Sequence, residues 1–85
     1  MPKYTVLISK SVQKLLKKMT DELADKLENK MLTLEDNPRP IGYKKLKGRN
    51  AFRIREGDYR IIYEINDLQI IVTVVNVGHR KNIYR

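Results

Sequence analysis

The chain has no cysteine, no tryptophan and a single histidine. The absence of cysteine excludes disulfide bonds and cysteine-ligated metal sites, and it fits a reducing cytoplasm. One histidine cannot build a zinc site, and the carboxylates show no spacing typical of metal ligands. We therefore expect neither a metal ion nor another cofactor.

Long apolar runs are absent too, because no stretch approaches the roughly 20 residues that cross a bilayer. The first residues turn polar too soon for a secretory signal. The 4 glycines are isolated, so no glycine-rich phosphate loop is present. We expect a soluble cytoplasmic protein with no membrane partner, folded as a single domain over residues 1–85.

Positive charge is abundant and unevenly placed. The chain carries 18 Lys and Arg against 10 Asp and Glu, a net charge of +8. Residues 1–43 hold eight basic and six acidic side chains, a net of +2, whereas residues 44–85 hold ten and four, a net of +6. This asymmetry indicates a polyanionic partner for the second half of the chain.

The first half predicts a strand followed by two helices. Residues 3–8 alternate like a strand, and Ser9 can cap the helix that follows. Two apolar stripes at helical spacing then predict helices, the second running from Thr20-Asp21 to Asn37-Pro38. The stripes consist of Val12, Leu15, Leu16 and Met19, and of Leu23, Leu27, Met31 and Leu34. Such a helical hairpin most simply covers one face of a sheet.

The second half predicts strands. Residues 44–47 form a short extended piece, and Ala51–Tyr63 forms a hairpin that turns at Gly57-Asp58. Asn66-Asp67 makes another tight turn, Leu68–Val77 is the most β-prone run, and residues 78–85 form a polar, basic tail. The predicted fold class is α+β, in the order β-α-α-β-β-β. An antiparallel sheet is backed on one face by the two-helix hairpin, with Ile61, Val72 and Val74 central in the core.

The hairpin carries three arginines on a short, stiff scaffold: Arg53, Arg55 and Arg60. Guanidinium groups match phosphate oxygens in geometry and are always charged, so this set predicts a phosphate site. The equal alternative is that the arginines only solvate an exposed sheet face. In the tail, Tyr84 lies among cations and could stack on an unpaired base, or it could dock the tail onto the sheet.

Two segments together resemble the RelE family of toxin–antitoxin toxins. They are KKLKGRNAFRIREGDYRIIYEI and VVNVGHRKNIYR, with Phe52 where the family usually has Tyr. The resemblance covers the whole chain in length and element order. It implies a RelE-like fold, similar to that of microbial ribonucleases. It also implies a toxin that enters the ribosomal A site and cleaves mRNA without a metal ion, and a RelB-like antitoxin that neutralises it in a hetero-oligomer.

The resemblance places the active cluster on five residues: Arg53, Arg55, Arg60, Arg80 and Tyr84. Arginine is effectively always protonated, so the general base must be another group, and His79 is the candidate with a suitable pKa. The alternative is that His79 only bonds to backbone. The remaining basic residues are candidates for RNA binding: Lys14, Lys17, Lys44, Lys45, Lys47, Arg49 and Lys81. For Lys14 and Lys17 a solvated helix face is the more ordinary interpretation.

Two other functions stay open from the sequence. A gyrase-inhibiting toxin of the related ParE group has the same fold and a similar hairpin, and the GHRKNIYR ending favours the nuclease over it. A non-catalytic RNA-binding module would carry the same basic residues.

Overall fold

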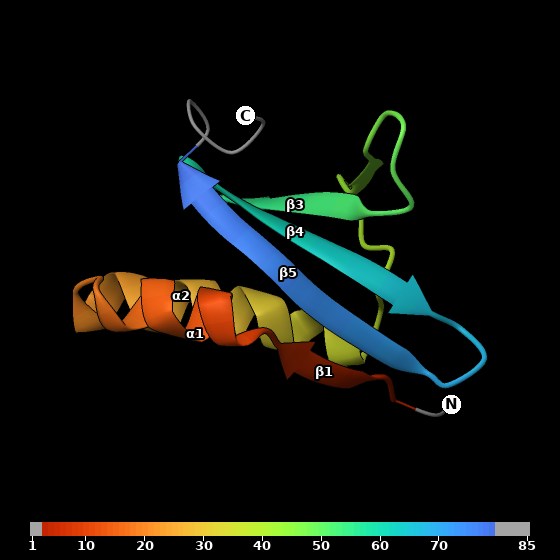
Figure 1. Cartoon of the computed structure of the whole chain (residues 1–85), viewed down its shortest axis with the longest axis horizontal. Coiled ribbons are helices and arrows are strands. Elements are labelled where there is room, and N and C mark those ends of the chain that lie inside the picture. The colour runs from red at the N-terminus through yellow and green to blue at the C-terminus, as the bar shows by residue number, and fades with distance from the viewer. Residues whose placement is uncertain (1–2, 80–85) are drawn as a thin grey trace.

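The computed structural model describes residues 3–79 and has a mixed α+β fold. Helices α1 (Lys10–Lys17) and α2 (Asp21–Leu32) form one layer against a five-stranded sheet (Figure 1). The strands are β1 (Thr5–Ile8), β2 (Lys44–Lys45), β3 (Phe52–Glu56), β4 (Tyr59–Asn66) and β5 (Ile71–His79). The predicted fold class is confirmed, with one strand more than expected, because β2 pairs with β3.

Both helices begin at hydroxyl caps. Ser9 Oγ accepts a hydrogen bond from the Val12 amide, as predicted, and Thr20 Oγ1 accepts one from the Leu23 amide, each at 3.3 Å. The α-helical part of α2 ends at Leu32, earlier than predicted. A 3₁₀ turn, η1 (Thr33–Glu35), follows it, since the last turn of a helix often tightens in this way.

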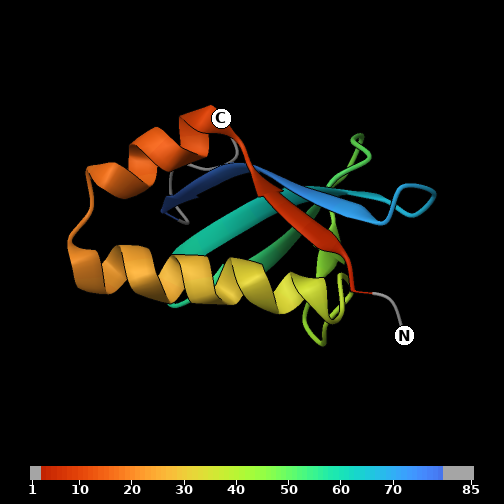
Figure 2. The same cartoon turned by 90° about the horizontal axis from the view of Figure 1, so that it is seen from below.

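The core lies between the helices and one face of the sheet. Val12, Leu27 and Met31 from the helices are fully buried there. The predicted central residues Ile61, Val72 and Val74 are also fully buried, which confirms that part of the prediction. Leu15 is an exception, because it lies exposed on α1. Figure 2 shows the two helices side by side, with strands β3 (green) and β4 (teal) behind them.

The strand order is β1-β5-β4-β3-β2, and β4 lies in the middle. The antiparallel meander predicted from sequence accounts for β2 to β5 only. β1 pairs in parallel with β5 at the edge of the sheet. Parallel neighbours need a long crossover, and here the helical hairpin and the other strands lie between them in sequence.

Strand β5 differs from its predicted range at both ends. It begins at Ile71 and not at Leu68, because the side chain of Asn66 accepts a hydrogen bond from the Gln69 amide at 2.9 Å and holds a turn. Ile70 completes this turn with a φ of 58°. At the other end β5 continues through Gly78 and His79, which were predicted to belong to the tail.

A β-bulge interrupts the pairing of β4 with β5. Ile62 lies opposite Asn76, but the next residue, Tyr63, lies opposite Val74, so Val75 is an extra residue. Side chains alternate between faces along a strand, and one extra residue inverts that alternation. Beyond the bulge, Val77 therefore faces the core, where it is buried, and Gly78 faces the other side.

Among residues 3–79, no helix is long and apolar enough to cross a lipid bilayer.

Candidate phosphate-binding site on the open face

The sheet face turned away from the helices, here called the open face, carries its side chains in rows across the strands. The first row contains Arg55, Arg60 and Gly78, from β3, β4 and β5. The second row contains Lys44, Arg53, Ile62 and Asn76. We call these two the basic rows. The three hairpin arginines predicted from sequence thus share one face.

The basic rows place like charges directly opposite one another. Arg55 is paired with Arg60, and Lys44 is paired with Arg53. The β-carbons of directly opposed residues lie about 4.5–5.5 Å apart, and like charges in such positions are destabilising. Lys44, Arg53 and Arg55 make no ion pair with any acidic residue in the described part of the chain. Departures of this kind from local stability occur at functional sites.

The Arg60 side chain lies low on the sheet. The residue is half-buried, and its Nε and Nη1 atoms are shielded from solvent. Its partner on β5 is Gly78, which has no side chain to compete for the space above the strand. A guanidinium group held against the sheet has fewer conformations to lose when it binds an anion.

The tight turn between β3 and β4 fixes the position of these arginines. Gly57 adopts a φ of 61°, and Asp58 does not have a positive φ. Glycine at the first central position with a positive φ is the pattern of a type II′ turn, whose twist matches that of the flanking strands. The predicted hairpin is confirmed, and its turn sets Arg55 opposite Arg60.

A loop between β2 and β3 packs onto the open face. The Leu46 amide donates a hydrogen bond to the Ala51 carbonyl at 2.8 Å, and Ala51 and Ile62 are buried against each other with Leu46 and Val75 around them. This small apolar cluster fixes the loop to the sheet. Lys47 and Arg49, both predicted to bind RNA, are exposed on this loop, which joins the strands that carry Lys44 and Arg53.

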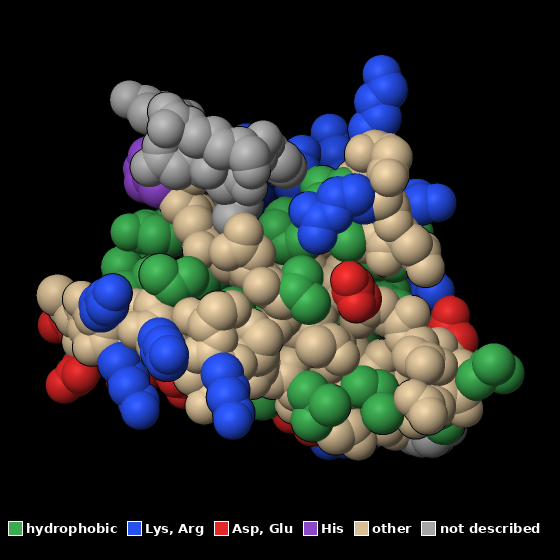
Figure 3. All heavy atoms as spheres, in the orientation of Figure 1, with side chains coloured by type: hydrophobic (Ala, Val, Ile, Leu, Met, Phe, Trp, Pro, Cys, Tyr) green, Lys and Arg blue, Asp and Glu red, His purple; other side chains and the backbone are tan. Residues whose placement is uncertain are grey.

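Other predicted RNA-binding residues lie elsewhere. Lys45 is opposite Phe52, whose side chain packs on the core side of the sheet, so Lys45 faces away from the arginines. Lys14 and Lys17 are exposed on α1, in the helical layer. Figure 3 shows lysine and arginine side chains in two separate groups, one over the helices and one over the end of the molecule that holds β2 and β3.

The structure does not bring His79 to the arginines. His79 is opposite Tyr59, and the two rings meet edge to face with centroids 5.7 Å apart. Tyr59 packs against the main core, so this pair lies on the helix side of the sheet. The bulge at Val75 is the cause, because regular pairing of the same residues, with no bulge, would turn His79 to the open face. Arg80, Lys81 and Tyr84 lie outside the described residues.

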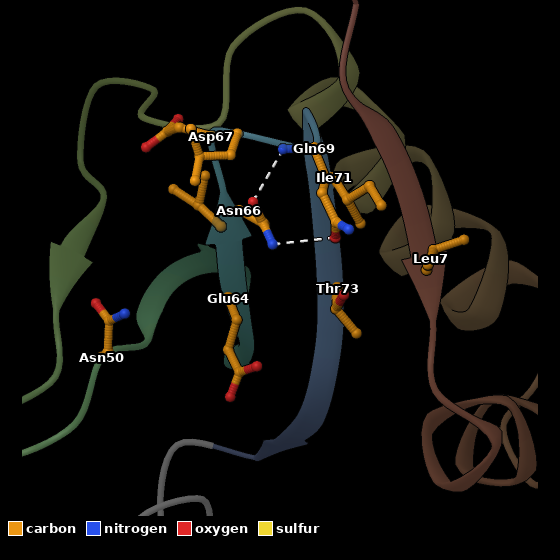
Figure 4. A pocket seen from close by; sticks show the side chains of 10 residues that line it. Leu7, Asn50, Glu64, Asn66, Asp67, Gln69, Ile71 and Thr73 are labelled. Atoms are coloured by element: carbon orange, nitrogen blue, oxygen red, sulfur yellow. Dashed lines mark hydrogen bonds between the residues drawn. The ribbon is translucent and has the colours of Figure 1, made fainter.

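The charge of the open face changes sign along β4. The third row contains Glu64, Thr73 and Leu7, from β4, β5 and β1. A depression of about 680 Å³ lies over this row, and Figure 4 shows Glu64 between Asn50 on one side and Thr73 on the other. The basic rows are thus followed directly by a carboxylate and a hollow surface.

Asp67 at the rim of this depression is hydrogen-bonded to other residues of the chain. Its carboxylate accepts hydrogen bonds from Tyr4 at 2.7 Å and from both terminal nitrogens of Arg39 at 3.2 and 2.8 Å. The bonds from Arg39 and then Tyr4 lower the pKa of Asp67 below its ordinary value. This link joins the start of the chain, the loop after α2 and the turn before β5, so we assign it a structural role.

On the helix side, Tyr63 extends the core into the same loop. Its hydroxyl donates a hydrogen bond to the Pro38 carbonyl at 2.7 Å, and burial raises the pKa of Tyr63 above its ordinary value. Phe52 packs between Tyr63 and Tyr43, with ring centroids 6.0 and 5.8 Å away. The family's usual Tyr is replaced here by a ring that faces away from the arginines.

Sequence reasoning did not single out Glu64, which lies on the open face of β4, or Asn76, which completes the second row. Asn76 was the available signal, because asparagine is depleted in strands and stands in a run of valines and isoleucines. Its side chain accepts a hydrogen bond from the Val77 amide at 2.9 Å at the bulge. Within residues 3–79, no three histidine, aspartate or glutamate side chains form a group that could hold a metal ion.

Residues 4–84 match the sequence model of a family described as the ParE toxin of the type II toxin–antitoxin system parDE. No curated protein is a significant match to the chain by sequence.

Several solved structures have the same fold. The toxin–antitoxin complex RelBE2 of Mycobacterium tuberculosis matches with a TM-score of 0.83 and 26% identity, covering 96% of this chain and 97% of that one. The archaeal RelE–RelB complex of Pyrococcus horikoshii matches with a TM-score of 0.82 and 28% identity, covering 94% and 98%. A mutant of Escherichia coli toxin RelE in the free state matches with a TM-score of 0.76 and 23% identity, covering 93% and 85%.

Proposed function

Since the chain belongs to the ParE toxin family of type II toxin–antitoxin systems, within the RelE/ParE superfamily, we propose that it is a cytoplasmic, ribosome-dependent mRNA endonuclease. One observation carries this proposal above all others. Lys44 is set opposite Arg53, and Arg55 is set opposite Arg60, on one exposed sheet face. Opposed cations of this kind gain stability when a phosphate lies between them.

The arginines suit RNA cleavage that uses the substrate's own nucleophile. The 2′-oxygen attacks the adjacent phosphorus while its proton passes to a base. The bond from phosphorus to the 5′-oxygen breaks, and that oxygen takes a proton from an acid or from water. The products are a 2′,3′-cyclic phosphate and a 5′-hydroxyl. Negative charge gathers on the phosphoryl oxygens in the transition state, where Arg53, Arg55 and Arg60 stabilise it.

The base is not supplied by the basic rows, because arginine stays protonated. His79 faces the helix side, on the other side of the sheet from Arg60. We therefore place the base among Tyr84 and Lys81 of the tail or in a group of the ribosome. Arg80 and Tyr84 complete the site in this proposal, Arg80 as a further cation and Tyr84 as the platform for the base of the scissile nucleotide.

The partner that controls the activity is proposed to be a RelB-like antitoxin, in a hetero-oligomer. Two of the similar structures are complexes of a RelE-type toxin with its antitoxin. A net charge of +8 favours an acidic or amphipathic antitoxin segment. Co-expression with an adjacent reading frame should restore the growth of cells that produce this protein.

Gyrase inhibition is the second candidate, and the description of the matching family as the ParE toxin favours it. A toxin of this kind leaves mRNA intact and produces gyrase-linked breaks in DNA. The basic rows would then contact DNA or an acidic surface of gyrase. A non-catalytic RNA-binding module is the third, and it would produce neither outcome.

The deciding experiment maps mRNA ends in a purified translation system with and without the protein. New ends within A-site codons, absent when ribosomes are omitted, are the expected result. Lys44→Ala and Lys45→Ala form a matched pair of variants, because these neighbours face opposite sides of the sheet. Lys44→Ala should slow cleavage and Lys45→Ala should not. Intact mRNA together with gyrase-linked DNA breaks would contradict the nuclease proposal.

A further inference from the structure

The depression beside the basic rows is lined by both apolar and polar side chains. Its volume of about 680 Å³ lies within the usual range for small-molecule sites, about 300–1,000 Å³. Leu7, 48% exposed, and Ile71 supply an apolar wall, and Thr73 and Asn50 supply a hydroxyl and an amide. Leu7 comes from β1, Ile71 and Thr73 come from β5, and Asn50 comes from the loop after β2 (Figure 4).

Glu64 is the available charged group of this depression. Asp67 is bound by Arg39 and Tyr4, and Asn66 and Gln69 are hydrogen-bonded to each other at 3.1 Å. The Glu64 carboxylate makes no hydrogen bond or ion pair with any residue that the structure describes. An ionised carboxylate only accepts hydrogen bonds, so it binds a group that presents N–H or O–H donors.

The position of Glu64 decides what that group is. Arg53 is opposite Ile62, two residues before Glu64 on β4, so Arg53 and Glu64 are diagonal neighbours about 7–8 Å apart. A basic peptide that reached Glu64 would be repelled by Lys44, Arg53, Arg55 and Arg60. A nucleotide satisfies both regions, because its phosphate is anionic and the edge of its base donates hydrogen bonds.

We propose that Glu64 and the depression around it form a pocket that recognises a nucleobase next to the phosphate held by the basic rows. The carboxylate has two oxygens side by side, and guanine presents two adjacent donors, N1–H and the N2 amino group. Uracil presents one donor between two carbonyl oxygens, which the carboxylate repels. The pocket therefore favours guanine most and uracil least, and Thr73 and Leu7 contact the base beside Glu64. This inference rests on the proposed mRNA cleavage.

The test measures cleavage rates on ribosomes programmed with mRNAs in which each A-site codon position is varied among the four bases. Wild-type protein should cleave faster with guanine than with uracil at one position. Glu64→Gln should reduce that preference about tenfold or more, because the variant loses one of the two acceptor oxygens of a bidentate contact. Glu56→Gln is the matched control. It makes the same change on the same sheet, but Glu56 is opposite Tyr59 on the helix side.

A base preference that is identical in wild-type protein and Glu64→Gln contradicts base recognition by the pocket, but it does not contradict the proposed nuclease activity. A uniform loss of rate at all codons also overturns base recognition, since this indicates a role in the chemical step. Weaker antitoxin binding with an unchanged preference overturns it in favour of a protein contact. If the protein cuts no mRNA, the proposed function fails. A measurement of nucleotide binding then tests whether the pocket recognises a base.

For that measurement, guanosine and uridine 5′-monophosphates are added to isotope-labelled protein and observed by NMR. The pocket is supported if guanosine monophosphate shifts the signals of Leu7 and Thr73 more than uridine monophosphate does, and if Glu64→Gln removes the difference. Shifts confined to Arg53, Arg55 and Arg60, or equal for both nucleotides, contradict it.

Discussion

The two faces of the sheet differ in how their side chains interact with the rest of the chain. The helix-covered face is filled by apolar residues such as Leu27 and Tyr63, each fully buried, and Tyr63 also satisfies its hydroxyl through Pro38. The open face sets Arg55 against Arg60 and Lys44 against Arg53, and it leaves Glu64 without a partner among the described residues. One face is filled by side chains of the chain itself, whereas the other carries like charges opposite one another and a carboxylate with no partner among the described residues.

The largest expected effect is on stability, from a substitution on the helix-covered face of the sheet. Leu27→Ala should reduce the free energy of unfolding by about 2–5 kcal/mol, because Leu27 is fully buried and its removal leaves a cavity. Leu32→Ala is the control, since Leu32 is on the same helix but 46% exposed, and its cost should stay within about 0.5 kcal/mol. Urea unfolding measures both. Equal effects would contradict the core described above.

Next in size is the loss of an arginine from the open face. Arg60→Ala should slow mRNA cleavage on the ribosome by at least about tenfold and leave ribosome binding largely intact, since only interactions stronger in the transition state raise the chemical rate. Single-turnover rates and binding are measured separately. Arg55→Ala should slow cleavage without lowering stability, because it removes one of two opposed charges. Loss of binding in proportion to rate would mean that the arginines only hold the substrate.

A smaller effect concerns the link at Asp67. Its pKa is lowered in the folded protein by Arg39 and Tyr4, so this carboxylate stabilises the fold above its unfolded pKa of about 3.9. That stabilisation is lost as the pH falls through the lower, folded value. Asp67→Asn should be less stable than wild type at neutral pH, and the difference should shrink below about pH 4.

Urea unfolding from pH 2 to 7 checks the Asp67 prediction. Asp58→Asn serves as the control, because Asp58 is exposed in the hairpin turn and makes no hydrogen bond or ion pair with a described residue. A difference between wild type and Asp67→Asn that does not depend on pH would contradict the role of the ionised carboxylate.

The smallest expected effect is at His79. Its ring packs against Tyr59 on the helix side, so His79→Gln should leave the dependence of the cleavage rate on pH unchanged between about pH 6 and 8. The single-turnover rate is measured across that range. A profile that becomes flat in the variant would show that His79 is the base after all.

Much of the fold could be predicted from the sequence because it follows from local patterns. The stripes with Leu27 and Met31, the glycine turn of the hairpin and the alternation of Arg53 with Ile54 each act over a few residues, and the structure confirms them. The resemblance to RelE toxins is confirmed at the level of the RelE/ParE superfamily. The parallel pairing of β1 could not be predicted, since it depends on contacts far apart in sequence.

Prediction of the site was less complete for the same physical reason. Three arginines on one hairpin need only strand periodicity to share a face, and they do. The placement of His79 depends on an extra residue, Val75, whose effect appears only when β5 pairs with β4. Glu64 has no distinguishing sequence pattern. It is distinguished only in the structure, where the polar side chains near it, Asp67 and Asn66, make hydrogen bonds to other residues.

The bulge at Val75 also affects how roles can be transferred between relatives. It makes the pairing of β5 as decisive as the identity of its residues, because a relative of the same length that paired without a bulge would present the position of His79 on the open face. Two relatives could then carry the same histidine at the same aligned position and use it differently, one in catalysis and one in packing. For this strand, the register of its pairing with β4 carries functional information that an alignment of residues does not show.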